Sequence, residues 1–301
     1  MKVIVTGGVG FVGTNLIKRL LKDGNEVVSL DNYSTGKKEN EQDGCKYIDV
    51  DISDSLRRHK GFGLEQYKLE KPDLIFHLGA LARIQPSLKK PASTITNNFM
   101  GTLNVLDYAR ENNIPVVYAG SSTFHHGLWG SPYAWSKHSG EQLCKLYSTI
   151  YGLPTAICRF YNVYGEHQLE DGAYATVVGI FQKLYREEKP LTVTGDGEQR
   201  RDFTHIEDIV DGLVKCGNSL LIPNAYNAKV SGQTFELGRG KNFSINELTE
   251  MFGETDVEYI PARDGEYDYT LADSSKAKEL LGWNPTLDIS DYISEVIDDK
   301  S

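Results

Sequence analysis

The sequence opens with MKVIVTGGVGFVG (residues 1–13), and this stretch decides the fold. An apolar strand centred on residues 3–5 runs into glycines at a spacing of three: Gly7, Gly10 and Gly13. A helix is expected to follow through Leu21. A tight strand-to-helix turn exposes free backbone N–H groups and the positive end of the helix dipole, which together bind phosphate. The stretch therefore predicts a dinucleotide-binding turn, although an ordinary glycine turn would share the spacing.

The end of the next strand selects between the two nicotinamide dinucleotides. This strand is expected over residues 26–30 and ends at Asp31, about 20 residues after the glycines. A carboxylate there accepts hydrogen bonds from the adenosine ribose and repels a 2′-phosphate. We therefore expect NAD rather than NADP as cofactor. The polar loop that follows, residues 32–36, is suited to wrap an adenosine.

Composition and charge are those of an ordinary soluble globular protein. The 301 residues are 40% hydrophobic and 25% charged, with a net charge of −10. Nucleic acid is an unexpected partner because no basic stripe is present. The four cysteines have no paired spacing, so neither disulfides nor a metal site is expected. We expect a cytoplasmic protein with no membrane partner, since the N-terminus lacks the features of a signal peptide and no run approaches the ~18 apolar residues of a membrane span.

Strands and helices alternate through the first half of the chain. Further strands are expected over 46–50, 73–78, 115–119 and 155–159, and helices over 97–110 and 132–151. This alternation predicts an α/β fold with a doubly wound parallel sheet of the Rossmann type, in residues 1–160. Ligands bind beyond the carboxyl ends of such strands. Residues 161–301, which include a short helix over 274–281, are expected to form mainly a smaller substrate-binding α/β cap, with segments near 206–238 returning to the first domain.

A catalytic base is suggested by a tyrosine and a lysine four residues apart. Tyr133 and Lys137 lie on one face of the helix expected over 132–151. A nearby ammonium lowers the tyrosine pKa from about 10, so that the phenol can take the proton of an alcohol being oxidised. Tyr133 follows the strand that brings Ser122 to the ligand-binding edge, although the three residues could merely cap and pack. Three other pairs share the spacing: Tyr33/Lys37, Tyr67/Lys71 and Tyr185/Lys189.

Short motifs occur along nearly the whole chain in the order of one family. They are TGGxGFxG at 6–13, DN at 31–32, DI at 51–52, HLGA at 77–80, NxxGT at 98–102, SS at 121–122, PYAxSK at 132–137, RFYNVYG at 159–165, GDGxQxRDF at 195–203 and RDGE at 263–266. On these motifs the chain resembles the extended short-chain dehydrogenase/reductase family, and within it the nucleotide-sugar epimerases and dehydratases.

The resemblance implies which residues hold NAD and a nucleotide-diphosphate sugar. The cofactor-binding residues would be Gly7, Gly10, Phe11, Val12 and Gly13 at the pyrophosphate, Asp31, Asn32, Tyr33, Ser34, Thr35 and Gly36 at the adenosine ribose, Asp51 and Ile52 at the adenine, and Leu78, Gly79, Ala80, Leu81, Ala82, Asn98, Tyr133, Lys137 and Tyr161 along the rest of the dinucleotide. The substrate-binding residues would be Ser122, Thr123, Tyr133, Asn162, Arg201 and Arg263, the last three at the diphosphate. Surface ion pairing with Asp202 or Asp264 is the other explanation for the two arginines.

The resemblance also implies a reaction in which Tyr133 is the base, Lys137 tunes it and Ser122 relays a proton. Dehydratases of this family carry an Asp-Glu pair after the position of Ser122, and decarboxylases carry a glutamate there. This chain has Thr123 and Phe124 instead, which cannot transfer a proton. We therefore expect a 4-epimerase of UDP-glucose and UDP-galactose or of their N-acetyl analogues. A dehydratase, a decarboxylase, a keto reductase and a non-catalytic NAD-binding sensor are the alternatives.

Some residues depart from the family pattern. His125 and His126 stand where Val-Tyr is usual, and Glu236 stands where Asn is common. Thr270, seven residues after Arg263, is small where some epimerases carry a tyrosine that excludes N-acetyl sugars. The pocket is therefore expected to admit such sugars. By analogy with the family we expect a homodimer formed through the helices over 97–110 and 132–151.

Overall fold

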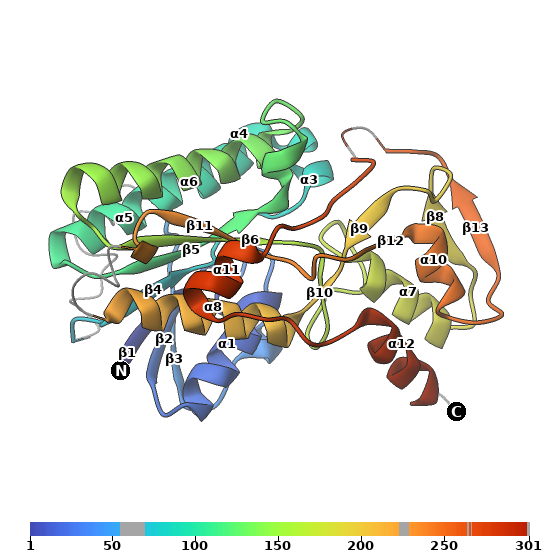
Figure 1. Ribbon diagram of the computed structural model, residues 1–301, viewed down its shortest axis with the longest axis horizontal. Coiled ribbons are helices and arrows are strands. Elements are labelled where there is room, and N and C mark those ends of the chain that lie inside the picture. Colours follow the sequence, from blue (N-terminus) through green and yellow to red (C-terminus); the bar gives the residue numbers. More distant parts are fainter. Residues whose placement is uncertain (55–69, 223–228, 264, 266, 300–301) are drawn as a thin grey trace.

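A seven-stranded parallel sheet forms the larger part of the molecule (Figure 1). The computed structural model describes residues 1–54, 70–222, 229–263, 265 and 267–299, so that Tyr67, Asp264 and Glu266 lie outside the described residues. The strand order is β11-β6-β5-β4-β1-β2-β3. The strands are β1 (Lys2–Thr6), β2 (Glu26–Asp31), β3 (Cys45–Asp49), β4 (Leu74–His77), β5 (Val116–Ser121), β6 (Thr155–Phe160) and β11 (Gln233–Leu237).

This order confirms the predicted doubly wound sheet. β1 pairs with β2 on one side and with β4 on the other, so that the strand order reverses next to β1. A crevice opens at such a point beyond the carboxyl ends of the strands. The central strands β4 and β5 are buried along their whole length because helices cover both faces of the sheet.

Helices form two layers, one on each face of the sheet (Figure 1). One layer holds α1 (Phe11–Lys22), α8 (Ile206–Leu221) and α11 (Ser275–Leu281). The other holds α3 (Ile84–Lys89), α4 (Pro91–Ile95), a π-helical turn (Thr96–Met100), α5 (Gly101–Asn112) and α6 (Pro132–Tyr151). Two short 3-10 helices span Lys38–Asn40 and Ser122–His126. A separate apolar core lies under each layer.

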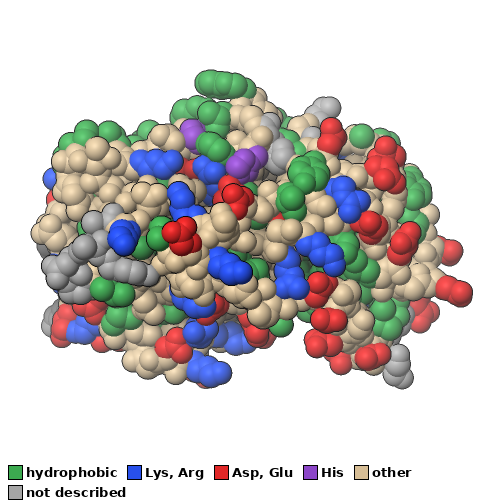
Figure 2. Space-filling view, in the orientation of Figure 1, with side chains coloured by type: hydrophobic (Ala, Val, Ile, Leu, Met, Phe, Trp, Pro, Cys, Tyr) green, Lys and Arg blue, Asp and Glu red, His purple; other side chains and the backbone are tan. Residues whose placement is uncertain are grey.

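Smaller elements with their own core form a second part beside the sheet. They are β7 (Val163–Tyr164), α7 (Val177–Arg186), β8 (Leu191–Thr194), β9 (Arg200–Asp202), β10 (Thr204–His205), β12 (Asn242–Ser244), α10 (Ile245–Glu250), β13 (Val257–Ile260) and α12 (Ile289–Asp298). Phe181, Leu248 and Ile293 are among its buried residues. Acidic side chains gather on this part in Figure 2. None of the described helices is long and apolar enough to cross a membrane.

One element lies elsewhere than the sequence predicted. The helix expected in the cap over residues 274–281 is α11, which packs against α8 and β11. Ala277 and Leu281 are buried in the core of the large sheet, together with Trp283, whose Nε1 donates a hydrogen bond to the Asp208 carbonyl at 2.8 Å. The helix therefore belongs to the larger part of the molecule and not to the cap, because its apolar residues pack against α8.

Candidate active site

A cavity of about 850 Å³ runs from the carboxyl ends of β1, β2 and β4 to the smaller part of the molecule. Most residues that the sequence analysis proposed for binding lie on its wall. They are Gly7, Gly10, Phe11, Val12, Gly13, Asp31, Asn32, Ser34, Thr35, Gly36, Asp51, Ile52, Leu78, Gly79, Ala80, Leu81, Ala82, Ser122, Thr123, Tyr133, Asn162, Arg201 and Arg263. Their individual roles stay predictions.

The glycine turn between β1 and α1 is packed too tightly for side chains. Gly7 has φ +74°, and a Cβ added to it would lie 2.8 Å from the Gly79 Cα. A Cβ added to Gly13 would lie 2.1 Å from the Gly7 carbonyl oxygen. Because glycine has no Cβ, the turn can lie directly against the residues that follow β4. The first residues of α1 line the cavity, where a phosphate can approach their N–H groups.

Asp31 is oriented by backbone hydrogen bonds at the end of β2. Its carboxylate accepts from the N–H of Val9 at 3.1 Å and of Tyr33 at 2.8 Å. Burial raises the pKa of Asp31, and these hydrogen bonds oppose the rise. The carboxylate is thereby fixed between the glycine turn and the loop that follows β2. This is the geometry required to bind ribose hydroxyls.

Four proposed residues do not line the cavity. The side chain of Tyr33 leaves it, because the hydroxyl donates a hydrogen bond to Glu41 at 2.6 Å. Asn98 lies behind the wall, where it donates to the Leu81 carbonyl at 3.1 Å and accepts from the Leu81 N–H at 2.8 Å. It therefore braces the Leu81 backbone. Lys137 and Tyr161 also lie outside the lining.

Phe160 takes the position on the cavity wall that was expected for Tyr161. Phe160 lines the cavity, whereas the Tyr161 hydroxyl donates a hydrogen bond to Glu236 at 2.7 Å. The reason is the alternation of side chains in an extended chain, in which neighbouring residues face opposite sides. The residue chosen by resemblance is one position too far along the chain, and its side chain therefore points away from the cavity.

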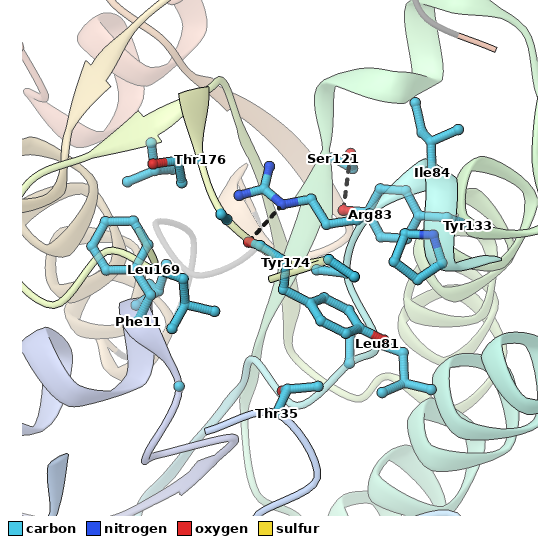
Figure 3. A pocket seen from close by; sticks show the side chains of 18 of the residues that line it. Phe11, Thr35, Leu81, Arg83, Ile84, Ser121, Tyr133, Leu169, Tyr174 and Thr176 are labelled. Carbon is cyan, nitrogen blue, oxygen red and sulfur yellow. Dashed lines mark hydrogen bonds between the residues drawn. The ribbon is translucent and has the colours of Figure 1, made fainter. Parts of the chain in front are cut away.

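Tyr133 enters the cavity from the first turn of α6. Pro132 occupies the first position of this helix, and the Ser131 side chain caps it by accepting from the Ala134 N–H at 3.1 Å. The Tyr133 hydroxyl donates a hydrogen bond to the Ser121 Oγ at 3.4 Å, as Figure 3 shows. Ser122 lines the cavity, but the serine bonded to Tyr133 is its neighbour, which the sequence analysis did not select.

Charge and burial compete for the pKa of Tyr133. Burial raises the pKa of Tyr133 above its ordinary value, and the hydrogen bond with Ser121 and the positive charge of Arg83 only partly offset this rise, so the expected lowering of the pKa is not found. The sequence analysis expected Lys137 to supply this charge. Instead the Lys137 Nζ lies 4.5 Å from the centre of the Tyr118 ring, below the cavity wall. Burial lowers the pKa of Lys137 to about 8, and Glu141, one helical turn further, opposes this shift.

The lowered Lys137 pKa predicts how stability depends on pH. Between about pH 8 and the ordinary value of 10.5, the folded protein holds fewer protons on Lys137 than the unfolded chain does. The cost of burying the charge is therefore fully present below pH 8 and disappears as the pH rises to 10.5. Lys137→Met removes this dependence. We expect the free energy of unfolding of the wild type, relative to Lys137→Met, to increase across this window in urea titrations without added NAD.

An ionic network joins α6 to β6 and β11. Arg159 donates to the Glu141 carboxylate, with Nη2 2.7 Å from Oε2, and its Nη1 lies 3.4 Å from the Glu236 Oε1. His125 lies 2.5 Å from the same Glu236 oxygen. Burial alone would raise the Glu236 pKa, but hydrogen bonds from the Asp273 N–H, Tyr161 and His125 outweigh it and lower the pKa. The Glu236 departure from the family pattern is thus matched by His125.

The two residues that replace the dehydratase acids have other contacts. The Thr123 hydroxyl donates a hydrogen bond to the Ser121 Oγ at 3.0 Å and lines the cavity. Phe124 packs under Arg159, whose guanidinium carbon lies 3.5 Å from the ring centre. Neither side chain can give or take a proton from a sugar at neutral pH.

The far end of the cavity is basic. Arg201 and Arg263 line it together with Asn162, whose Nδ2 donates to the Thr270 Oγ1 at 3.2 Å. Thr270 lines the cavity, but so does Tyr267, which the sequence analysis did not select. A bulky ring therefore stands near the small residue on which the expectation of a roomy sugar pocket rested.

Comparison with known proteins gives the family. The model of the "NAD dependent epimerase/dehydratase family" matches residues 3–228. The chain belongs to this family. A putative UDP-glucose 4-epimerase of Methanocaldococcus jannaschii is 31% identical, over 98% of this chain and 97% of the relative. UDP-glucuronic acid decarboxylase 1 of Arabidopsis thaliana is 31% identical over 99% of this chain and 69% of the relative.

A solved relative confirms the resemblance to the epimerases of this family. The Thermus thermophilus UDP-glucose 4-epimerase, in complex with NAD, superposes with a TM-score of 0.86 at 26% identity, covering 100% of this chain and 99% of that one. The residues of this family member fit NAD. The cradle at Gly7 and Gly13 has no room for a Cβ, and Asp31 is fixed at the end of β2.

Proposed function

We propose that this protein is an NAD-dependent nucleotide-sugar 4-epimerase that acts through a transient 4-keto sugar. One observation carries the proposal. Tyr133, a base suited to a hydroxyl, faces the cavity with Ser121, while Thr123 and Phe124 supply no carboxylic acid beside it. Removing and returning a hydride at one carbon needs the tyrosine and no further acid, whereas eliminating water requires an acid for the departing hydroxyl.

The residues of this chain have separate tasks in such a reaction. Tyr133 takes the proton of the sugar 4-hydroxyl, and Ser121 or Ser122 shares a hydrogen bond with the reacting oxygen. NAD, when bound, supplies the hydride acceptor and donor. Lys137 packs below the cavity wall against Tyr118, and Arg83 supplies the positive charge near Tyr133. The keto sugar turns, and Tyr133 returns the proton after the hydride has come back to the other face of C4.

The substrate is a nucleotide-diphosphate sugar. Arg201 and Arg263 hold its diphosphate with Asn162, since guanidinium groups bind phosphate oxygens through paired hydrogen bonds. The sugars proposed from the sequence are the UDP-glucose and UDP-galactose pair and their N-acetyl analogues. A homodimer through α5 and α6 is proposed from the family resemblance, and light scattering of the purified protein tests it.

A decarboxylase of the same family is the second candidate. It is favoured by the similarity to UDP-glucuronic acid decarboxylase 1 of Arabidopsis thaliana. The carboxylate-free positions Thr123 and Phe124 argue against it, as they do against a dehydratase. A non-catalytic NAD-binding sensor would have no use for Tyr133 and Lys137.

The test is turnover without added cofactor. Purified protein is incubated with UDP-glucose, UDP-galactose, UDP-N-acetylglucosamine and UDP-N-acetylgalactosamine, and the products are identified by NMR. We expect interconversion at C4 of at least one pair, and its loss in Tyr133→Phe. A dehydrated or decarboxylated product would replace the epimerase proposal with one of the alternatives.

A further inference from the structure

Arg83 lines the cavity from the larger part of the molecule, whereas Arg201 and Arg263 line it from the smaller part. It ends the loop that follows β4, directly before α3, and its Nε donates a hydrogen bond to the Tyr174 carbonyl at 3.1 Å. Tyr174 lies in the segment before α7, so this bond crosses the cavity. Figure 3 shows the Arg83 side chain next to Tyr133, with the end of its guanidinium group directed into the open space.

The backbone of Arg83 is strained. Its φ of 106° and ψ of 140° belong to a region that glycine adopts readily and side-chain-bearing residues avoid. Such strain persists only where the surroundings hold it, and it concentrates at active sites and ligand clamps. Glycine would adopt this backbone conformation with less strain. We therefore attribute the presence of arginine to a function of its side chain.

The charge of Arg83 has no counter-ion within the described part of the chain. No described carboxylate forms an ion pair with it, and the described acidic residues that line the cavity are Asp31 and Asp51 at the adenosine end. Burial lowers the pKa of this guanidinium. A partly buried cation is costly unless an anion pairs with it. The site is therefore built to receive an anion from the ligand.

The position of Arg83 narrows the identity of this anion. The proposed ligands of the diphosphate are Arg201 and Arg263, whereas Arg83 lies next to Tyr133, the proposed base for the sugar 4-hydroxyl. The group nearest to C4 that can carry a negative charge is the C6 carboxylate of a hexuronic acid, which is attached to the neighbouring carbon C5. Since the Tyr174 carbonyl occupies Nε, the two Nη groups remain for a carboxylate that approaches end-on.

We propose that Arg83 is a specificity-determining residue that binds the sugar carboxylate of a nucleotide-linked hexuronic acid. This inference rests on the proposed function and extends it from neutral hexoses to an acidic sugar, which becomes the preferred substrate. A single guanidinium thereby discriminates between sugars that differ only in the oxidation state of C6.

Binding and turnover test the proposal separately. UDP-glucuronate, UDP-glucose and UDP are titrated calorimetrically into the NAD-loaded wild type and into Arg83→Met, Arg83→Lys and Lys90→Met. We expect the wild type to bind UDP-glucuronate more tightly than UDP-glucose, and Arg83→Met to weaken UDP-glucuronate by about 10- to 100-fold. UDP-glucose and UDP should change by less than about threefold, since neither carries the sugar carboxylate and the proposed ligands of the diphosphate are other residues. Arg83→Lys keeps the charge but not the paired donors, so its loss should be intermediate.

Lys90→Met is the matched control because it removes a cation near Arg83 that is exposed and outside the cavity lining. Arg83→Gly relieves the backbone strain and replaces Arg83→Met if the latter does not fold. Equal losses for UDP-glucuronate, UDP-glucose and UDP would overturn the proposal in favour of a general phosphate or structural role, as would a wild type that prefers UDP-glucose. The absence of C4 interconversion with any sugar would instead sink the epimerase function, and the calorimetric result would still decide the role of Arg83.

Discussion

Tyr133→Phe is expected to lower kcat by about 10³-fold, within the range typical of a lost general base. Phenylalanine keeps the ring on α6 but cannot take the proton of the sugar 4-hydroxyl. The hydrogen bond with Ser121 is lost as well. Epimer formation under saturating nucleotide sugar, followed by NMR, measures the effect.

Tyr185→Phe is the matched control for this prediction. Tyr185 also has a lysine four residues later, Lys189, but it lies on α7 outside the cavity lining. We expect its kcat to remain within about twofold of the wild type, because its hydroxyl is remote from the reacting atoms. If Tyr133→Phe binds NAD and substrate and keeps more than a tenth of wild-type kcat, Tyr133 is not the base.

Arg159→Met is expected to destabilise the fold by about 3–5 kcal/mol, because it leaves the charge of Glu141 buried without a partner. The side chains of Arg159 and Glu141 are only 6% and 1% exposed. Glu236 loses a partner in the same variant. Urea titration at neutral pH measures the loss in the free energy of unfolding.

The double variant Arg159→Met/Glu141→Leu separates a lost ion pair from a lost fold. It removes both charges and fills the space with apolar groups, so we expect it to recover at least half of the stability lost in Arg159→Met. High salt should change the wild type little, since buried pairs are poorly screened. A single variant that loses less than about 1 kcal/mol would contradict a stabilising role for the buried Arg159–Glu141 pair.

The sequence predicted the sheet, the glycine turn and the position of Asp31 at the end of β2 well because short motifs specify them. The turn at Gly7 and Gly13 packs so closely against the neighbouring backbone that any added Cβ would meet backbone atoms. Asp31 is fixed by the end of β2 and by backbone N–H groups of its neighbours. Contacts of this kind are local in the chain, and residue spacing alone reveals them.

The rest of the site depends on which way individual side chains point. Phe160 lines the cavity in place of Tyr161, and Ser121 forms the hydrogen bond with Tyr133 that was expected for Ser122. A displacement of one residue is enough to change the direction of a side chain in an extended chain. The Arg83 side chain could not be placed from its motif, because its direction follows from an unusual φ and from a carbonyl 91 positions later in the chain. The pairing of Glu236 with His125 likewise joins residues 111 positions apart.

The most direct test of the epimerase account is the fate of the hydrogen on C4. UDP-glucose and UDP-glucuronate, each deuterated at C4, are incubated with the purified protein without added cofactor until the epimers equilibrate, and NMR locates the deuterium. If a hydride leaves and returns at C4, we expect deuterium to remain on C4 in both epimers and no label to enter water. Deuterium on any other carbon, or its loss to solvent, would contradict a hydride that leaves and returns at a single position.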